Sequence, residues 1–120
     1  MQTSAKKLNP QIQKQIDRIF YQTLADLKRI EDMKIFLRDF LTQTEQSVLT
    51  KRLAVAMYLE KGRSYDQIKQ ALKVSSATIA HVDKMMNQKS EGFILALRRM
   101  EADEWASRIS KKVLGFLNKL

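Results

Sequence analysis

The sequence predicts an all-α protein of about six helices. Glycine and proline, which interrupt helices, are scarce, with three glycines and one proline in 120 residues. Apolar residues recur at spacings of three and four, and no segment alternates apolar and polar residues as a half-buried strand would. We therefore expect helices along nearly the whole chain, with long amphipathic helices at both ends.

The first helix is expected to begin at Pro10. Asn9 can accept a hydrogen bond at the N-cap, and proline at the first helical position lacks only an N–H that would be unpaired there. The apolar stripe from Ile12 to about Ile30 indicates a long amphipathic helix. A short helix with apolar residues from Met33 to Leu41 should follow. Because it is apolar on more than one side, we expect it to be central in the fold.

Threonine and serine caps mark the starts of the later helices. Thr42 and Glu45 have the spacing of a capping box, and they should open a helix that Gly62 closes in the left-handed conformation. Ser64 should cap the short helix that follows. Ser90 and Glu91 form another cap-like pair, so the last helix is expected from about residue 90 to about residue 118.

The segment from about residue 64 to about residue 86 has the pattern of a helix-turn-helix. Two short helices meet across a polar break, and apolar residues occupy the positions that lock such helices at a steep angle, namely Ile68, Leu72, Val74, Ile79 and Val82. In that geometry the second helix, capped by Ser75 or Ser76, lies in the DNA major groove. The candidate base readers, phosphate anchors and supporting charges are Ser75, Ser76, Thr78, His81, Lys73 and Lys84.

Lys73 departs from this pattern, because helix-turn-helix turns usually have glycine at this position. A left-handed backbone costs a residue with a side chain on the order of 1 kcal/mol. Two features favour DNA binding: the second helix carries small and hydroxylated side chains, and the chain is basic, with a formal net charge of +9. We therefore expect double-stranded DNA as a partner.

Several other classes of protein are excluded by the residue types. The chain has no cysteine and one histidine, His81, so we expect neither a disulfide nor a metal site. No nucleophile pairs with a base, and Asp103 and Glu104 are adjacent on a helix and cannot face each other. We expect no enzyme activity and no cofactor. The N-terminus lacks the apolar run of a signal peptide, and no segment is long enough to span a membrane, so a cytoplasmic protein is expected.

Four motifs follow one another between about Ile35 and Met86: Phe40-Leu41-Thr42 with Glu45, Lys51-Arg52-Leu53, Gly62, and Ala77-Thr78-Ile79. With these motifs the sequence resembles the tryptophan-repressor superfamily of helix-turn-helix proteins. The resemblance implies an all-helical, intertwined homodimer that binds operator DNA through two helix-turn-helix units. It also implies a transcriptional regulator, and we expect a repressor rather than an activator.

The resemblance also bears on a small-molecule effector. In tryptophan repressors the indole ring lies between two arginines; by position Arg52 matches the first, whereas the second falls at His81 and a serine that holds the amino group falls at Met85. We therefore do not expect tryptophan to be sensed, and the effector is unknown. For Arg52 we prefer a DNA phosphate contact or a salt bridge to Glu45. For His81 we prefer a base or phosphate contact, or a plain surface position.

The two outer helices have several interpretations. The stripe from Ile12 to Ile30 suits a core element, a dimer seam or a membrane-surface helix, but Asp17 and Asp26 dilute its basic face, so we expect packing or dimerisation. The last helix has a similar stripe of Trp105, Ile109, Val113 and Phe116, with Arg98, Arg99, Lys111 and Lys112 as candidate phosphate contacts.

The sequence thus predicts a flexible N-terminus over residues 1–9 and a single helical DNA-binding domain over residues 10–120. The leading function is a homodimeric DNA-binding regulator. The alternative is a module whose helix-turn-helix packs against a protein, or associates with RNA, without reading DNA sequence. An apolar patch over the second helix would favour the alternative, whereas exposed polar side chains on a basic face would favour DNA.

Overall fold

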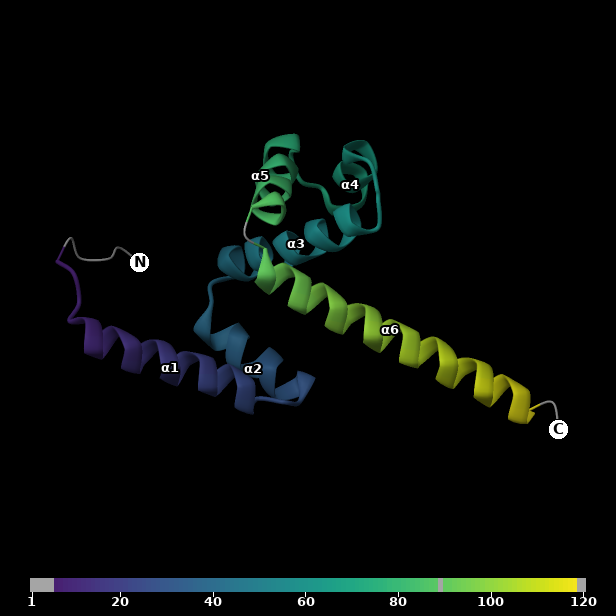
Figure 1. Ribbon diagram of the computed structural model, residues 1–120, viewed down its shortest axis with the longest axis horizontal. Coiled ribbons are helices and arrows are strands. Elements are labelled where there is room, and N and C mark those ends of the chain that lie inside the picture. The colour runs from purple at the N-terminus through teal and green to yellow at the C-terminus, as the bar shows by residue number, and fades with distance from the viewer. Residues whose placement is uncertain (1–5, 89, 119–120) are drawn as a thin grey trace. The chain divides into compact units, whose positions relative to one another are not determined.

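The computed structural model describes residues 6–88 and 90–118, without the side chains of residues 105–114 and 116–118. Within this part the chain forms six helices and no strand (Figure 1), which confirms the all-α prediction. The helices are α1 (Pro10–Asp26), α2 (Ile30–Phe40), α3 (Gln43–Glu60), α4 (Tyr65–Leu72), α5 (Ser76–Asn87) and α6 (Glu91–Asn118). None of the described helices is both long and apolar enough to cross a membrane.

The caps predicted for α1 and α3 are present. The Asn9 side chain accepts a hydrogen bond from the Gln11 N–H at 2.8 Å. Thr42 Oγ1 accepts from the Glu45 N–H at 3.1 Å, and the Glu45 carboxylate accepts from the Thr42 N–H at 2.9 Å. Gly62 follows α3 with a φ of 76°, as expected for a left-handed cap. These local features therefore follow from residue type and spacing alone.

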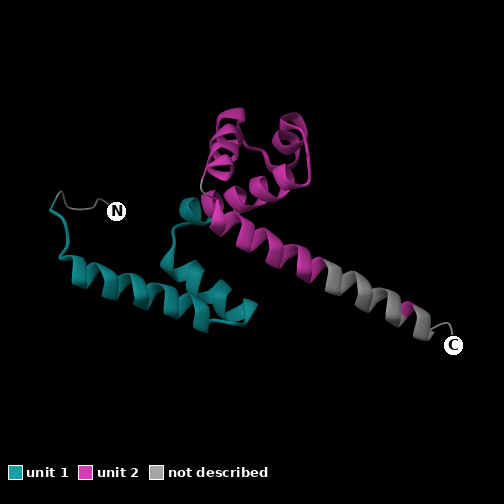
Figure 2. Cartoon of the chain, viewed as in Figure 1, with its two compact units in different colours: residues 1–46 teal, residues 47–120 magenta. Residues whose placement is uncertain are grey.

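The chain divides into two compact units, residues 1–46 and residues 47–120 (Figure 2). In the first unit α1 ends at Asp26, so the prediction that it continues to about Ile30 was wrong. The backbone turns at Leu27, with φ −82° and ψ 78°, and Ile30 is instead the first residue of α2. The single-domain assignment of residues 10–120 stays a prediction.

Aromatic side chains hold the first unit together, and none of its described residues, 6–46, is buried. The ring of Phe40 lies 5.0 Å from that of Phe36 and 5.8 Å from that of Phe20 in α1. No residue of α1 or α2 is buried, and Ile35 is 52% exposed. The expectation that α2 is central was therefore wrong for the single chain. A helix that is apolar on several sides has too few neighbours within this unit to cover them.

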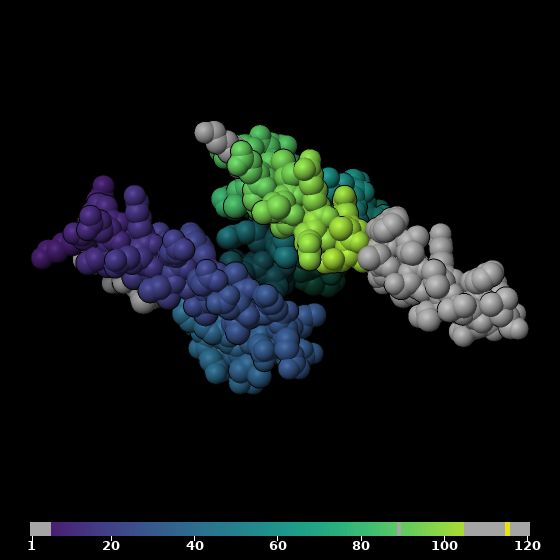
Figure 3. Space-filling view, turned by 60° about the horizontal axis from the view of Figure 1, so that its bottom comes forward, coloured from purple at the N-terminus to yellow at the C-terminus, as the bar shows by residue number. Residues whose placement is uncertain are grey.

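The core lies in the second unit, where α3, α4 and α5 meet. Its fully buried residues are Val55, Ala56, Ile68, Ile79 and Val82. The first part of α6 packs on the same core through Phe93, and Leu97 of α6 is also buried. An ion pair of 3.3 Å joins Lys61 Nζ to Glu104 in α6. This first part of α6, yellow-green in Figure 3, therefore belongs to the second unit.

The expectations for the last helix are only partly covered by the described residues. Arg98 and Arg99 are exposed on α6. The side chains of the predicted stripe, Trp105, Ile109, Val113 and Phe116, and those of Lys111 and Lys112, lie outside the described residues.

Candidate nucleic-acid interface

The two helices of the predicted helix-turn-helix are α4 and α5, and each starts with a serine cap. Ser64 Oγ accepts from the Gln67 N–H at 3.2 Å, while the Gln67 side chain accepts from the Ser64 N–H at 2.9 Å. Ser75 Oγ accepts from the Thr78 N–H at 3.1 Å, which identifies Ser75 and not Ser76 as the cap of α5. Both helix starts are therefore fixed locally.

The connection between α4 and α5 contains the strained position that the sequence predicts. Lys73 has φ 54° and ψ 48°, and it is the only residue other than glycine with a positive φ in the described chain. Its N–H closes α4 by donating to the Lys69 carbonyl oxygen at 2.9 Å. Three residues later α5 begins, which gives the short break that the helix-turn-helix pattern requires.

Packing then decides which side of α5 reaches solvent. Ile79 and Val82 are fully buried against Ile68 of α4 and the core residues of α3. The predicted DNA-contacting side chains of this segment are all exposed, namely Lys73, Ser75, Ser76, Thr78, His81 and Lys84. Ile79 and Val82 of α5 thus point inward, whereas its hydroxylated and basic side chains point outward, the arrangement that a DNA-reading helix needs.

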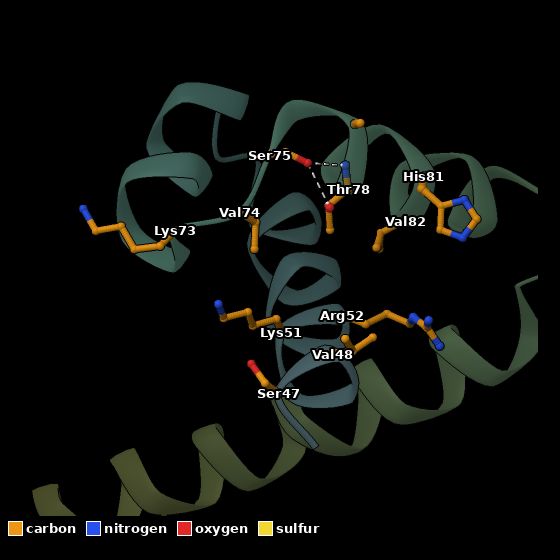
Figure 4. A pocket seen from close by; sticks show the side chains of 11 residues that line it. Ser47, Val48, Lys51, Arg52, Lys73, Val74, Ser75, Thr78, His81 and Val82 are labelled. Carbon is orange, nitrogen blue, oxygen red and sulfur yellow. Dashed lines mark hydrogen bonds between the residues drawn. The ribbon is translucent and has the colours of Figure 1, made fainter. Parts of the chain in front are cut away.

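A groove of about 560 Å³ lies between α3 and the α5 segment (Figure 4). Its floor is apolar and its rim carries hydroxyls and cations, and it is lined by Ser47, Val48, Lys51, Arg52, Lys73, Val74, Ser75, Ala77, Thr78, His81 and Val82. In Figure 4, Arg52 and His81 extend on one side of the groove and Lys51 and Lys73 on the other. No lining residue is acidic, so the groove attracts anions.

The predicted salt bridge between Arg52 and Glu45 is absent, and that alternative was wrong. The Glu45 carboxylate is bonded at the cap of α3, where the backbone N–H of Thr42 and then its hydroxyl lower the pKa of the carboxyl group. The two residues are seven positions apart, about 10 Å along a helix. Within the described residues Arg52 makes no ion pair, so its guanidinium is available at the groove.

The structure thus brings Arg52, Lys73, Ser75, Thr78 and His81 together at one groove, whereas Ser76 and Lys84 lie on the exposed face of α5 outside its lining. Met85 is half-buried and does not line the groove.

Sequence reasoning missed two features of this site. Ser47 and Lys51 join the groove from α3, although nothing in their local pattern places them opposite α5. The hydroxyl of Tyr65 donates to Asp83 at 2.9 Å across α4 and α5. Because both features join segments far apart in sequence, residue spacing gave no signal of them.

Two short helices packed on one core, a strained short turn between them and an exposed polar face on the second define a helix-turn-helix protein. Over residues 14–101 the sequence matches the family described as Trp repressor protein. The chain belongs to this family, whose name denotes a DNA-binding regulator.

Individual relatives agree with this assignment. The chain is 33% identical over 94 residues to the uncharacterised protein YerC of Bacillus subtilis. The aligned region covers 78% of this chain and 89% of YerC. The fold resembles that of a TrpR-like protein from Eubacterium eligens, with 27% identity, a TM-score of 0.71 and coverage of 78% and 96% of the two chains. A Staphylococcus aureus protein proposed to be a Trp repressor gives 29% identity, a TM-score of 0.67 and the same coverage.

Proposed function

We propose that this protein is a homodimeric transcriptional repressor of the cytoplasm that inserts α5 into the major groove of operator DNA. The observation that carries the proposal is the exposed polar face of α5 beside a groove lined by two lysines, an arginine and a histidine, with no acidic residue. Phosphate contacts position such a protein on the duplex, and contacts to base edges select the sequence.

The exposed residues divide between these two tasks. Thr78 and His81 lie in the first half of α5, which reaches base edges in a helix-turn-helix complex. Arg52, Lys73 and Lys84 supply phosphate contacts, and Ser75 and Ser76 lie at the start of α5, where backbone N–H groups also attract phosphate.

A protein partner for α5 is less well supported than DNA. No large apolar side chain is exposed on α5, which the structure describes over its whole length. An interface with another protein would need an apolar patch at its centre.

The homodimer is supported by the apolar surface of the first unit. Ile12, Ile16, Ile19, Ile35 and Phe40 are each between 45% and 64% exposed on α1 and α2. Soluble proteins cover apolar surfaces of this extent, and a second copy covering them accounts for a first unit without a buried core.

DNA binding is tested by titrating a fluorescent duplex with the purified protein at several salt concentrations. The logarithm of the affinity should fall linearly with the logarithm of salt, with a slope of about −0.9 per phosphate neutralised. Replacing Arg52, Lys73 and Lys84 by alanine should reduce the magnitude of the slope by about 3 for each bound protomer. Replacing Lys14, Arg18 and Lys28 of the first unit removes the same charge and should have a smaller effect.

Binding that is absent at low salt, or that both triple variants lose equally, overturns the proposed interface. Light scattering tests the dimer: two chains of 14.0 kDa should give a particle of about 28 kDa, and a stable monomer at micromolar concentration contradicts it. Tryptophan is not proposed as the effector, because His81 and Met85 stand where the family has an arginine and a serine. Adding tryptophan should therefore leave the DNA affinity unchanged.

A further inference from the structure

We propose that Tyr65 is a positioning residue for the DNA-reading helix: its hydroxyl holds the carboxylate of Asp83 against α4 and thereby fixes the rotation of α5. The inference rests on the proposed DNA-binding function and adds to it a residue outside the DNA-contacting set. Tyr65 is the first residue of α4, lies beyond the lining of the groove and carries no charge that a phosphate would attract.

The geometry uses both oxygens of one carboxylate. Tyr65 Oη donates to Asp83 Oδ2 at 2.9 Å, and Asn87 Nδ2, one turn further along α5, donates to Asp83 Oδ1 at 3.1 Å. The first of these is the one side-chain hydrogen bond that joins α4 to α5 within the described residues. Donation to Asp83 also raises the pKa of the Tyr65 phenol, as expected when a hydroxyl faces a carboxylate.

The core decides which side of α5 is buried, and a directional bond adds a contact that fixes the rotation of α5 within that packing. Ile68 and Ile79 are fully buried and hold α4 and α5 together, but apolar burial is non-directional. Because the side chains of a helix are fixed around one axis, any rotation of α5 about that axis moves all of its exposed side chains relative to the bases. The bond from Tyr65 to Asp83 fixes this rotation at a point away from the exposed face of α5.

The same bond controls an unfavourable charge. Asp83 is the sole acidic residue of α5, and it lies next to Lys84, which faces solvent. The Tyr65 hydroxyl and the Asn87 amide each donate to this carboxylate, so both of its oxygens are bonded within the protein.

The test compares Tyr65→Phe, which keeps the ring and removes the hydroxyl, with the wild type. The matched control is Tyr58→Phe, because Tyr58 lies in the same unit and its hydroxyl makes no hydrogen bond to a described residue. The probes are a duplex selected from random DNA by the wild-type protein and an unselected duplex. The readout is the ratio of the two affinities, which does not change if a variant merely unfolds in part, because both probes then bind less protein.

We expect this ratio to fall about three- to tenfold in Tyr65→Phe, the range for losing one typical intramolecular hydrogen bond, and to be unchanged in Tyr58→Phe. Asp83→Ala should reduce the ratio similarly, and the double variant should lose little more than either single variant, because the two residues act through one bond. Independent losses, or a ratio that Tyr65→Phe leaves at the wild-type value, overturn the inference while the DNA-binding function stands. A wild-type protein that binds no duplex overturns both.

A measurement without DNA tests the bond itself. In protein labelled with 13C at the tyrosine ring, the resonance of Tyr65 should titrate at higher pH in the wild type than in Asp83→Ala. Equal titration in the two proteins shows that the bond is not formed and overturns the inference, whatever the DNA affinities are.

Discussion

Replacing Lys73 by glycine should make the protein more stable and at the same time weaken its binding to DNA. At φ 54° and ψ 48° the side chain of Lys73 is held in the left-handed region, which costs about 1–2 kcal/mol for a residue with a Cβ. Glycine relieves this strain but has more freedom in the unfolded chain, which offsets about 0.4–1 kcal/mol.

The net gain in the free energy of unfolding is therefore about 0.8 kcal/mol, within a range of about 0–1.6 kcal/mol. For a chain of this size such a gain raises the melting temperature by about 2–6 °C. Thermal and urea unfolding measure the stability, and titration with duplex DNA measures the affinity. Removing one cation should lower the magnitude of the salt slope by about 1 for each bound protomer.

Lys73→Ala is the matched control, since it removes the same charge and keeps the Cβ. It should reduce the DNA affinity as much as Lys73→Gly does and should not raise the melting temperature. If the two variants are equally stable, the strain at this turn does not limit stability and the reasoning fails. If only one of them loses DNA affinity, the loss does not come from the charge.

Three further predictions concern the elements that hold the interface. Ser75→Ala should cost about 1 kcal/mol of stability by removing the cap of α5, whereas Ser76→Ala should change little, as measured by urea unfolding. Ile79→Ala should cost about 2–5 kcal/mol because the side chain is fully buried, and Leu95→Ala, at a 74% exposed position, should cost far less in the same assay. Glu45 stabilises the fold only as a carboxylate, since its cap bond lowers the pKa in the folded state; this stability is complete above the pKa of the unfolded chain and is lost as pH falls through the lower folded value. Melting curves between pH 6 and pH 3, run against Glu45→Gln, should show a smaller pH dependence in the variant.

The helix starts could be predicted because capping is local. A capping bond depends on a serine or threonine and the residue three positions later, so the caps at Thr42 and Ser64 were predictable without a structure. The left-handed end at Gly62 was predictable for a similar reason, because glycine favours that conformation. The end of α1 was not, because the break at Leu27 has neither glycine nor proline and the apolar spacing continues through it to Ile30. Tertiary context overrides local preference at such a position.

The sequence predicted the α5 side of the candidate interface but only part of the α3 side. Thr78 and His81 follow from the helix-turn-helix pattern, and both are exposed as expected. The groove could not be foreseen, since Ser47 and Lys51 reach it from α3, whose position depends on how Val55 and Ile79 pack. The partner of Asp83 was missed for the same reason: Tyr65 lies 18 residues earlier, and only the crossing of α4 and α5 brings them together.

The small core has a consequence for the amount of protein that a cell must make. Among the described residues six apolar side chains are buried, all in the second unit. If a second copy completes the first unit, folding becomes a bimolecular equilibrium, and the melting temperature rises with concentration. Dilution would then loosen the structure itself, and newly synthesised chains would acquire their full stability only after enough of them had accumulated to meet.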